Sequence, residues 1–360
     1  MSEMSEMSQM SPHAAPARPY PALPATDASA LTNKSFQNDQ DVRWCPGCGD
    51  YSILAQVHKV LPTLGIPKEE FVFVSGIGCS SRFPYYMNTY GLHTIHGRAP
   101  AVATGVKALR PELSVWMITG DGDSLSIGGN HLIHLLRRNV DVKVLLFNNR
   151  IYGLTKGQYS PTSEQGKRTK SSPLGSIEEP FNPLSLALGA RASFVARSID
   201  IEAKHLQETL AASAQHKGTA LVEILQNCNI FNDGAFEGIT DRKVKAERQV
   251  HLSAGQPALF GAERELGLVF DHNSLSFKVA RVDEVGLEQI YVHDPQNLMA
   301  AQLLAEMSAP ELPVAFGVLY ERARPTYEEQ LAAQLAEAQR RAGGRPSMQS
   351  LLEAGETWRV

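Results

Sequence analysis

The stretch that decides the fold covers residues 115–149 and reads VWMITGDGDSLSIGGNHLIHLLRRNVDVKVLLFNN. It contains two apolar runs, 115–118 and 142–147, with the length and composition of buried β-strands. Side chains between the runs recur at helical spacing along one face: Ile127, His131, Leu132, Leu135 and Leu136. This pattern predicts two parallel strands joined by a crossover helix. That unit is typical of a doubly wound, mostly parallel α/β sheet.

A polar cluster follows each apolar run. Gly120, Asp121 and Gly122 come after the first run, and Asn148 and Asn149 come directly after the second. Because ligands bind at the carboxyl edge of such sheets, we expect both clusters to line one site. Carboxylate and amide oxygens suit Mg²⁺ or Ca²⁺, and a helix N-terminus nearby favours a diphosphate. Either cluster alone would be an ordinary turn or loop, but the pair favours a metal–diphosphate site.

The cysteines form a second candidate site. Four occur in the chain: Cys45, Cys48, Cys79 and Cys228. The first two share one short loop, and the others follow the strand-like runs 71–74 and 220–225. Four thiolates from three loops fit either structural zinc or an iron–sulfur cluster. One close pair plus two single cysteines favours iron–sulfur, although the spacing leaves both open.

Two other interpretations of the cysteines carry less weight. A disulfide framework is not expected in a chain of 360 residues in which we recognise no secretory signal. A thioredoxin-like redox pair at Cys45 and Cys48 fits the local motif. That interpretation leaves Cys79 and Cys228 as ordinary buried thiols.

Taken together, these motifs resemble the β subunit of a 2-oxoacid:ferredoxin oxidoreductase, most closely of the 2-oxoglutarate type. The resemblance covers about residues 41–241. Its hallmarks, besides Cys228, are 44–50 (WCPGCGD), 76–80 (GIGCS), 96–99 (HGRA), 120–123 (GDGD) and 148–158 (NNRIYGLTKGQ). The fold that it implies is the diphosphate-binding domain of thiamine diphosphate enzymes, which agrees with the predicted sheet.

The resemblance also implies the cofactors and their ligands. Thiamine diphosphate would be held by Mg²⁺ on Asp121, Asn149 and the carbonyl of Ile151, and the four cysteines would bind a [4Fe–4S] cluster. The implied cofactor-binding residues are His96, Gly97, Arg98, Gly120, Asp121, Gly122, Asp123, Asn148 and Asn149. Asp123 is in addition expected to cap the crossover helix. Lys156 is expected to border the pocket and contact the substrate or coenzyme A, although a solvated lysine or arginine is the ordinary alternative for Lys156 and Arg98.

By resemblance, the chain oxidatively decarboxylates a 2-oxoacid to acyl-CoA and CO₂ and passes electrons through the cluster to ferredoxin. The resemblance favours 2-oxoglutarate, with pyruvate or another 2-oxoacid as the alternative. A thiamine decarboxylase or carboligase outside this group would leave the cysteines unexplained. A non-catalytic zinc-stapled module would leave the spacing of the two polar clusters to chance.

Composition sets the remaining expectations. The chain is 43% hydrophobic, so it can bury a large hydrophobic core. Its net charge is −4, so it lacks the excess of basic residues that is typical of proteins that bind nucleic acid. No apolar run approaches the ~20 residues that span a bilayer. Reduced thiols and an oxygen-labile cluster imply a cytoplasmic setting.

We expect four regions along the chain. Residues 1–32 form a disordered tail, 33–243 the α/β domain, 244–342 a smaller C-terminal extension, and 343–360 a flexible tail. The extension ends in a helix at 327–341. The polar loop 159–183, which follows the predicted Mg²⁺ site, is expected to be a mobile flap or a partner contact.

The resemblance generates a first prediction. Thiamine activation needs a glutamate at the aminopyrimidine ring, and the family supplies it from an α subunit. The purified chain alone is therefore expected to reduce no electron carrier with any 2-oxoacid and coenzyme A. Substantial turnover in an anaerobic assay without the α subunit would contradict this.

Overall fold

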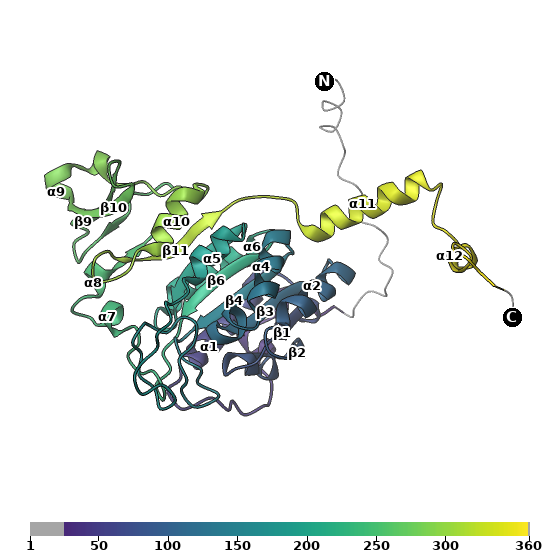
Figure 1. Ribbon diagram of the computed structural model, residues 1–360, viewed down its shortest axis with the longest axis horizontal. Coiled ribbons are helices and arrows are strands. Elements are labelled where there is room, and N and C mark those ends of the chain that lie inside the picture. The colour runs from purple at the N-terminus through teal and green to yellow at the C-terminus, as the bar shows by residue number, and fades with distance from the viewer. Residues whose placement is uncertain (1–24, 359–360) are drawn as a thin grey trace, which may run out of the picture.

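The computed structural model describes residues 25–358, and its core is an eight-stranded sheet in the order β2-β1-β3-β4-β6-β5-β11-β7 (Figure 1). Six neighbouring strands are parallel: β2 (Tyr90–His93), β1 (Phe71–Ser75), β3 (Ser114–Gly120), β4 (Val142–Asn148), β6 (Ala220–Leu225) and β5 (Phe194–Ile199). The predicted doubly wound α/β class is confirmed.

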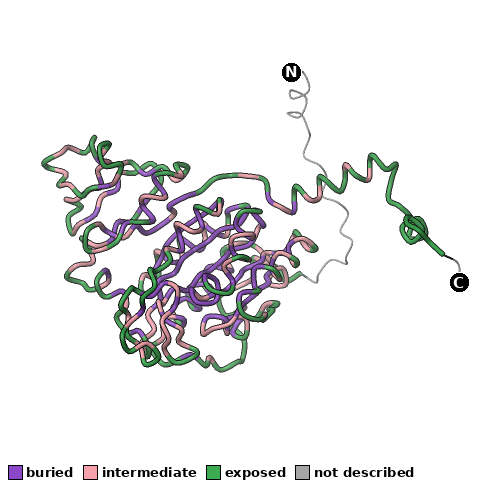
Figure 2. Tube along the Cα trace, in the orientation of Figure 1, coloured by how far each residue is buried: buried purple, intermediate pink, exposed green. Residues whose placement is uncertain are grey.

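Helices cover both faces of this sheet. Helices α2 (Ala99–Leu109), α4 (Gly129–Arg138), α5 (Pro183–Gly189) and α10 (Leu298–Glu306) pack over one face. Helices α1 (Asp50–Val60) and α6 (Ala203–Gln215) pack over the other. Successive side chains of β3 show why both faces need covering, since Val115 and Met117 belong to one core and Trp116 and Ile118 to the other. The strands β1, β3, β4, β6 and β5 are accordingly buried along almost their whole length, whereas the edge strand β2 is exposed (Figure 2).

The crossover between β3 and β4 differs from the single helix that we predicted. It is broken into α3 (Asp121–Leu125) and α4, and Ile127, expected on the packed face, lies in the break and is 61% exposed. The break allows a close backbone approach, because a Cβ on Gly97 would lie 2.4 Å from the Cα of Gly128. The predicted single helix is therefore interrupted between Leu125 and Gly129, where Gly97 approaches Gly128.

The expected boundary between the domain and the C-terminal extension also differs from the structure. Strand β11 (Val314–Glu321) pairs antiparallel with β5, and β7 (Gln249–His251) pairs with β11, so the extension completes the main sheet. The rest of it forms a small antiparallel sheet of β8 (Leu259–Phe260), β9 (Leu266–Asp271) and β10 (Ser276–Arg281), with short helices α7 (Glu237–Thr240), α8 (Lys245–Arg248) and α9 (Val282–Val285) nearby.

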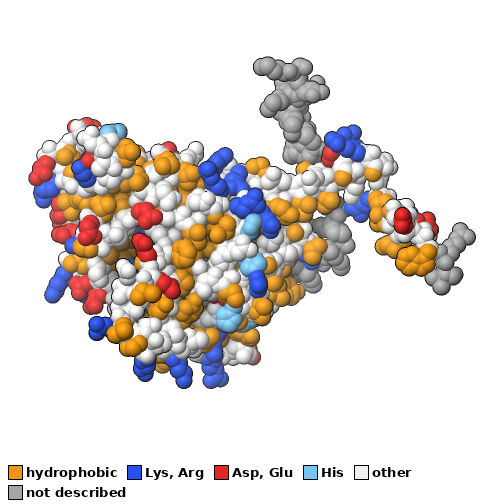
Figure 3. Space-filling view, in the orientation of Figure 1, with side chains coloured by type: hydrophobic (Ala, Val, Ile, Leu, Met, Phe, Trp, Pro, Cys, Tyr) orange, Lys and Arg blue, Asp and Glu red, His pale blue; other side chains and the backbone are white. Residues whose placement is uncertain are grey.

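Helix α11 (Tyr327–Arg341), which matches its predicted bounds, projects from the body and leads to α12 (Met348–Leu352) (Figure 1). Exposed apolar side chains gather on α12 and beyond it (Figure 3): Met348, Leu351, Leu352 and Trp358. Of the N-terminal tail expected at 1–32, residues 1–24 lie outside the described residues. Residues 25–32 lie against the domain, where the amide of Thr26 donates to Glu69 at 3.0 Å. No helix among residues 25–358 has the length and apolarity to cross a membrane.

A buried ion network joins α2 to β4 at the edge of the sheet opposite the polar clusters. The carboxylate of Asp141 lies 2.6 Å from Nζ of Lys143 and 2.9 Å from Nζ of Lys107, and both lysines are buried. Burial by itself would raise the pKa of Asp141, but the two ammonium groups hold it at about 2. The carboxylate thus compensates two buried cations.

Replacing this carboxylate tests the network. Asp141→Asn is expected to lower the free energy of unfolding by about 3–5 kcal/mol, because it leaves buried lysines uncompensated. Since the folded pKa is below the unfolded value, this contribution is present above about pH 4 and is lost as the pH falls toward about 2. Urea titrations across this range should show the two proteins converging.

The matched control is Asp283→Asn, which breaks an exposed pair with Arg281 at 3.1 Å. Its effect should stay below about 1 kcal/mol. Equal effects of the two substitutions would contradict the proposed difference between the pairs.

Candidate active site

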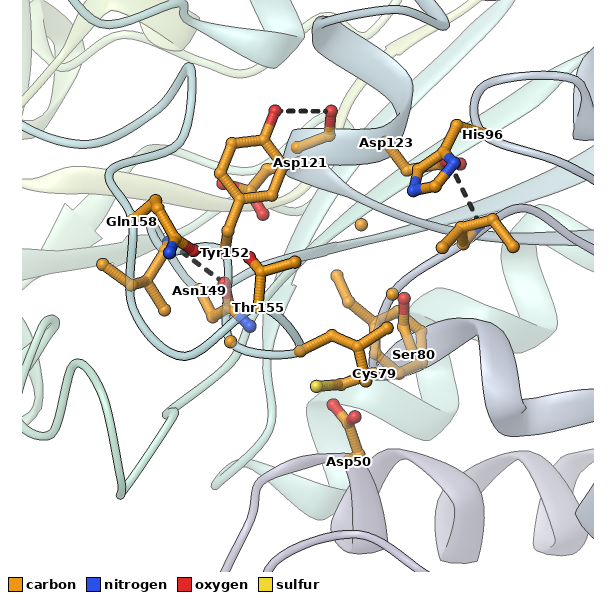
Figure 4. A pocket seen from close by; sticks show the side chains of 18 residues that line it. Asp50, Cys79, Ser80, His96, Asp121, Asp123, Asn149, Tyr152, Thr155 and Gln158 are labelled. Carbon is orange, nitrogen blue, oxygen red and sulfur yellow. Dashed lines mark hydrogen bonds between the residues drawn. The ribbon is translucent and has the colours of Figure 1, made fainter. Parts of the chain in front are cut away.

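The largest concentration of predicted site residues lines one cavity of about 420 Å³ at the carboxyl edge of the sheet. This size falls within the roughly 300–1,000 Å³ of small-molecule and cofactor pockets. The lining includes these predicted residues: Cys79, His96, Gly120, Asp121, Gly122, Asp123, Asn149 and Ile151. Figure 4 shows Asp121, Asn149 and Tyr152 on one side of it, and Cys79 beside Asp50 on another.

Asp121 is a buried charge in this cavity, with 3% of its surface exposed. One carboxylate oxygen accepts hydrogen bonds from the hydroxyls of Ser160 at 2.5 Å and Thr162 at 2.6 Å. Burial raises the pKa of Asp121, although both hydroxyls act to lower it. A buried carboxylate with no cation beside it is costly, and a divalent ion would offset that cost. The carboxylate therefore fits a Mg²⁺ ligand.

The two asparagines at the end of β4, Asn148 and Asn149, make different contacts. Asn149 lines the cavity, and its amide donates to Gln226 at 2.9 Å and accepts from the Ile151 amide at 3.1 Å. Asn148 points away, where it donates to Glu223 at 2.7 Å. Asp121, Asn149 and Ile151 thus line one cavity, whereas Asn148 is bonded to Glu223 in the neighbouring strand β6.

Two glycines permit close contacts that no other residue would allow. A Cβ on Gly122 would lie 2.1 Å from the ring of Tyr152, whose hydroxyl donates to the Gly122 carbonyl at 3.1 Å. Gly97 has a φ of +67° and meets the backbone of Gly128. Of the two, Gly122 lies in the lining of the cavity itself.

Asp123 does not cap the crossover helix, which corrects our expectation. It lies inside α3, and its carboxylate accepts from the amides of Ile77 at 3.1 Å and Gly97 at 2.8 Å and from the Thr119 hydroxyl at 2.9 Å. A capping side chain accepts from amides in the first turn of its own helix, whereas this carboxylate accepts from other segments of the chain. It joins two loops, at Ile77 and Gly97, to the end of strand β3 beside the cavity.

The four cysteines lie on three loops that are hydrogen-bonded to one another. Trp44 donates its indole N–H to the Cys79 carbonyl at 2.7 Å, and Asn229 donates to the Pro46 carbonyl at 2.7 Å. A Cβ on Gly153 would lie 3.5 Å from the sulfur of Cys79 and 3.6 Å from that of Cys228. All four are free thiols. The structure therefore gathers the cysteine loops beside the cavity.

The thiols are also electrostatically linked. Burial, followed by the charge of Asp50, raises the pKa of Cys79 to about 12, and charges on Cys228 and Cys45 add to the effect. The pKa of Cys48 is raised by the same causes. Four cysteines on adjoining loops are the donors that an iron–sulfur cluster takes as thiolates. The donor set thus fits iron–sulfur.

Comparison with known proteins identifies the family. Residues 76–224 match the family "Thiamine pyrophosphate enzyme, C-terminal TPP binding domain". The chain is 54% identical over 332 residues to the 2-oxoglutarate oxidoreductase subunit KorB of Mycobacterium tuberculosis, covering 91% of this chain and 88% of that protein. The chain belongs to the 2-oxoacid:ferredoxin oxidoreductase β-subunit family.

Two further relatives support this family. The 2-oxoacid:ferredoxin oxidoreductase 1 β subunit of Aeropyrum pernix is 48% identical over 190 residues, which cover 53% of this chain and 60% of that one. A solved structure of the 2-oxoglutarate:ferredoxin oxidoreductase of Magnetococcus marinus, with 2-oxoglutarate, coenzyme A and succinyl-CoA bound, superposes with a TM-score of 0.72. It is 33% identical and covers 91% of this chain and 97% of its own.

Three residues that the family resemblance brought into the site lie at its margin. His96 lines the cavity and is exposed, whereas Arg98 and Lys156 are exposed and are not part of the lining. Lys156 belongs to the turn 151–158, in which Leu154, Thr155 and Gln158 reach the cavity. A role for Lys156 in substrate or coenzyme A binding stays a prediction.

Several residues of the site were not predicted from the sequence. Ser160 and Thr162, which contact Asp121, come from the expected flap, so its first turn covers the carboxylate. Gln226 joins the two candidate sites, because it accepts from Asn149 at 2.9 Å and its amide lies 3.3 Å from the sulfur of Cys48. Asp50, the last residue of the hallmark 44–50, is buried beside the thiols, and burial raises its pKa to about 7.

The contact between Gly122 and Tyr152 generates a prediction. Gly122→Ala would force the ring aside at a cost of about 1–3 kcal/mol. We expect thiamine diphosphate to bind the assembled enzyme more weakly by a comparable free energy, measured by calorimetry.

Gly129→Ala is the matched control, because a Cβ at this helical position meets nothing within 4 Å. It is expected to leave cofactor binding unchanged. Wild-type affinity in Gly122→Ala would contradict the importance of the close approach.

Proposed function

We propose that this chain is the β subunit of a 2-oxoglutarate:ferredoxin oxidoreductase. With an α subunit, it would convert 2-oxoglutarate and coenzyme A to succinyl-CoA and CO₂ while two oxidised ferredoxins each accept one electron. The observation that carries the proposal is that one cavity is lined both by the oxygen ligands Asp121 and Asn149 and by Cys79. The identity to named β subunits supports the same assignment.

Asp121, Asn149 and the carbonyl of Ile151 would hold Mg²⁺, and the ion would bind the diphosphate of the cofactor. When bound, thiamine diphosphate supplies the carbanion stabilisation that decarboxylation of a 2-oxoacid requires. The residues of the chain position the cofactor and exclude water from it. Tyr152 packs on Gly122, and Ile77 and Phe147 add apolar walls to the cavity.

Cys45, Cys48, Cys79 and Cys228 would hold the [4Fe–4S] cluster, the group that carries single electrons to ferredoxin. Hydrogen bonds between their loops and the position of two sulfurs beside Gly153 support this set. The Gln226 amide, 3.3 Å from the sulfur of Cys48, is placed to influence the potential of a cluster there. The cytoplasmic setting expected from reduced thiols stays a prediction.

The α subunit would cover the flap 159–183 and the mouth of the cavity. Large apolar side chains in this region are exposed, including Leu174 at 94% and Ile177 at 88%. Phe181 and Leu154, which lie on the flap and on the turn that lines the cavity, are also exposed. An apolar surface next to a cofactor pocket is typical of a protein interface. It supports an active site completed by the partner.

The function is tested by anaerobic co-expression with an α subunit. The complex is expected to reduce ferredoxin with 2-oxoglutarate and coenzyme A faster than with pyruvate. Asp121→Asn should lower Mg²⁺ affinity at least about tenfold, since second-shell changes alone cost about 10–100-fold. Asp39→Asn, at an exposed position, removes the same charge and should keep full activity.

Metal analysis separates the alternatives. Iron in the purified complex with ferredoxin reduction supports the proposal. One zinc and no iron per chain would favour a zinc-stapled module, and decarboxylation without carrier reduction would favour a different thiamine enzyme.

A further inference from the structure

A second cavity, of about 640 Å³, lies between α6 and β7, away from the cofactor site. Its lining contains two histidines, a carboxylate and a lysine: Glu202, His205, Lys245 and His251. Glu202 and His205 lie at the start of α6, whereas His251 ends β7 in the C-terminal extension. The cluster therefore joins two parts of the chain that are distant in sequence.

The geometry of the cluster is close to that of a metal site. One ligand atom from each of Glu202, His205 and His251 lies within 4.8 Å of the other two. Nε2 of His251 is already 3.5 Å from a Glu202 carboxylate oxygen. In a tetrahedral zinc site, with bonds of about 2.0–2.1 Å, ligand atoms lie about 3.4 Å apart. Small side-chain movements would complete such a site.

Both imidazoles are held in place by neighbouring groups. Nδ1 of His205 lies 2.9 Å from the Ser198 hydroxyl, which leaves Nε2 as the nitrogen available to a metal. Metal-binding histidines ordinarily use their second nitrogen in such a bond. The ring of His251 stacks on Phe316, with centroids 5.5 Å apart and an angle of 21°. The two histidines meet edge to face at 4.8 Å.

The carboxylate of Glu202 is available for a cation. Glu202 occupies the N-cap position of α6, yet its side chain makes no capping hydrogen bond. Its side chain is 13% exposed, and Nζ of Lys245 lies 2.9 Å from one oxygen without hydrogen-bond geometry. The Lys245 side chain is 39% exposed and can move into solvent. The lysine thus pairs with the carboxylate that a divalent cation would bind.

We propose that Glu202, His205 and His251 form a zinc-type transition-metal site, and that Lys245 competes with the metal for Glu202. Two histidines and one glutamate are a known zinc ligand set, with a fourth position left for water. The bound ion would tie α6 to β7 and so fasten the C-terminal extension to the α/β domain. The proposal does not depend on the proposed function of the cofactor site.

The test uses the complex with its iron cluster assembled, so that the cysteines do not take up zinc. After equilibrium dialysis against buffered Zn²⁺, mass spectrometry should find one more zinc per chain in wild type than in His251→Ala. Losing a ligand should weaken binding at least about tenfold, since even second-shell changes cost about 10–100-fold. Zinc should also raise the melting temperature of wild type but not that of His251→Ala.

Two variants make the test specific. His272→Ala removes an exposed imidazole on another loop and should bind zinc as wild type does. Lys245→Met removes the competing ammonium and should bind zinc more tightly. Equal zinc uptake by wild type and His251→Ala, or weaker binding by Lys245→Met, would overturn the proposal.

Discussion

The buried carboxylate of Asp123 is the interaction on which the candidate site depends. It accepts from the main chain of the Cys79 loop at Ile77, from the HGRA segment at Gly97, and from Thr119 at the end of β3. A Cβ on Gly76 would lie 1.9 Å from the same carboxylate, so the loop reaches it only because glycine stands there. One side chain thereby fixes the position of a cysteine, a cofactor loop and the Gly-Asp-Gly turn. Local chain geometry alone would not bring these segments together.

The parts of the molecule that follow local patterns were predictable from the sequence. The strand at 220–225 and the helix at 327–341 have their predicted bounds, because an apolar run indicates a buried strand and an Ala- and Gln-rich segment favours a helix. The grouping of Asp121, Asn149 and Cys79 followed from the rule that parallel strands end at a common edge. Family resemblance supplied the chemistry that spacing left open.

The rest depends on long-range contacts that carry no local signal. Ile127 was assigned to a packed helical face, but the approach of Gly97 to Gly128 breaks that helix. The hydroxyls of Ser160 and Thr162 reach Asp121 from an irregular polar loop, in which no periodicity marks them. The pairing of β11 with β5 joins segments more than a hundred residues apart, and only the folded sheet reveals it.

That pairing has a consequence for how the chain is made. Until β11 leaves the ribosome, β5 is the open border of a six-stranded parallel sheet, with unpaired amides and carbonyls. An open border of this kind pairs with strands of other chains. The nascent enzyme is therefore prone to aggregation until β11 pairs with β5. Premature stop codons before residue 314 would leave the cofactor loops intact yet yield a protein prone to aggregation, for a reason unrelated to catalysis.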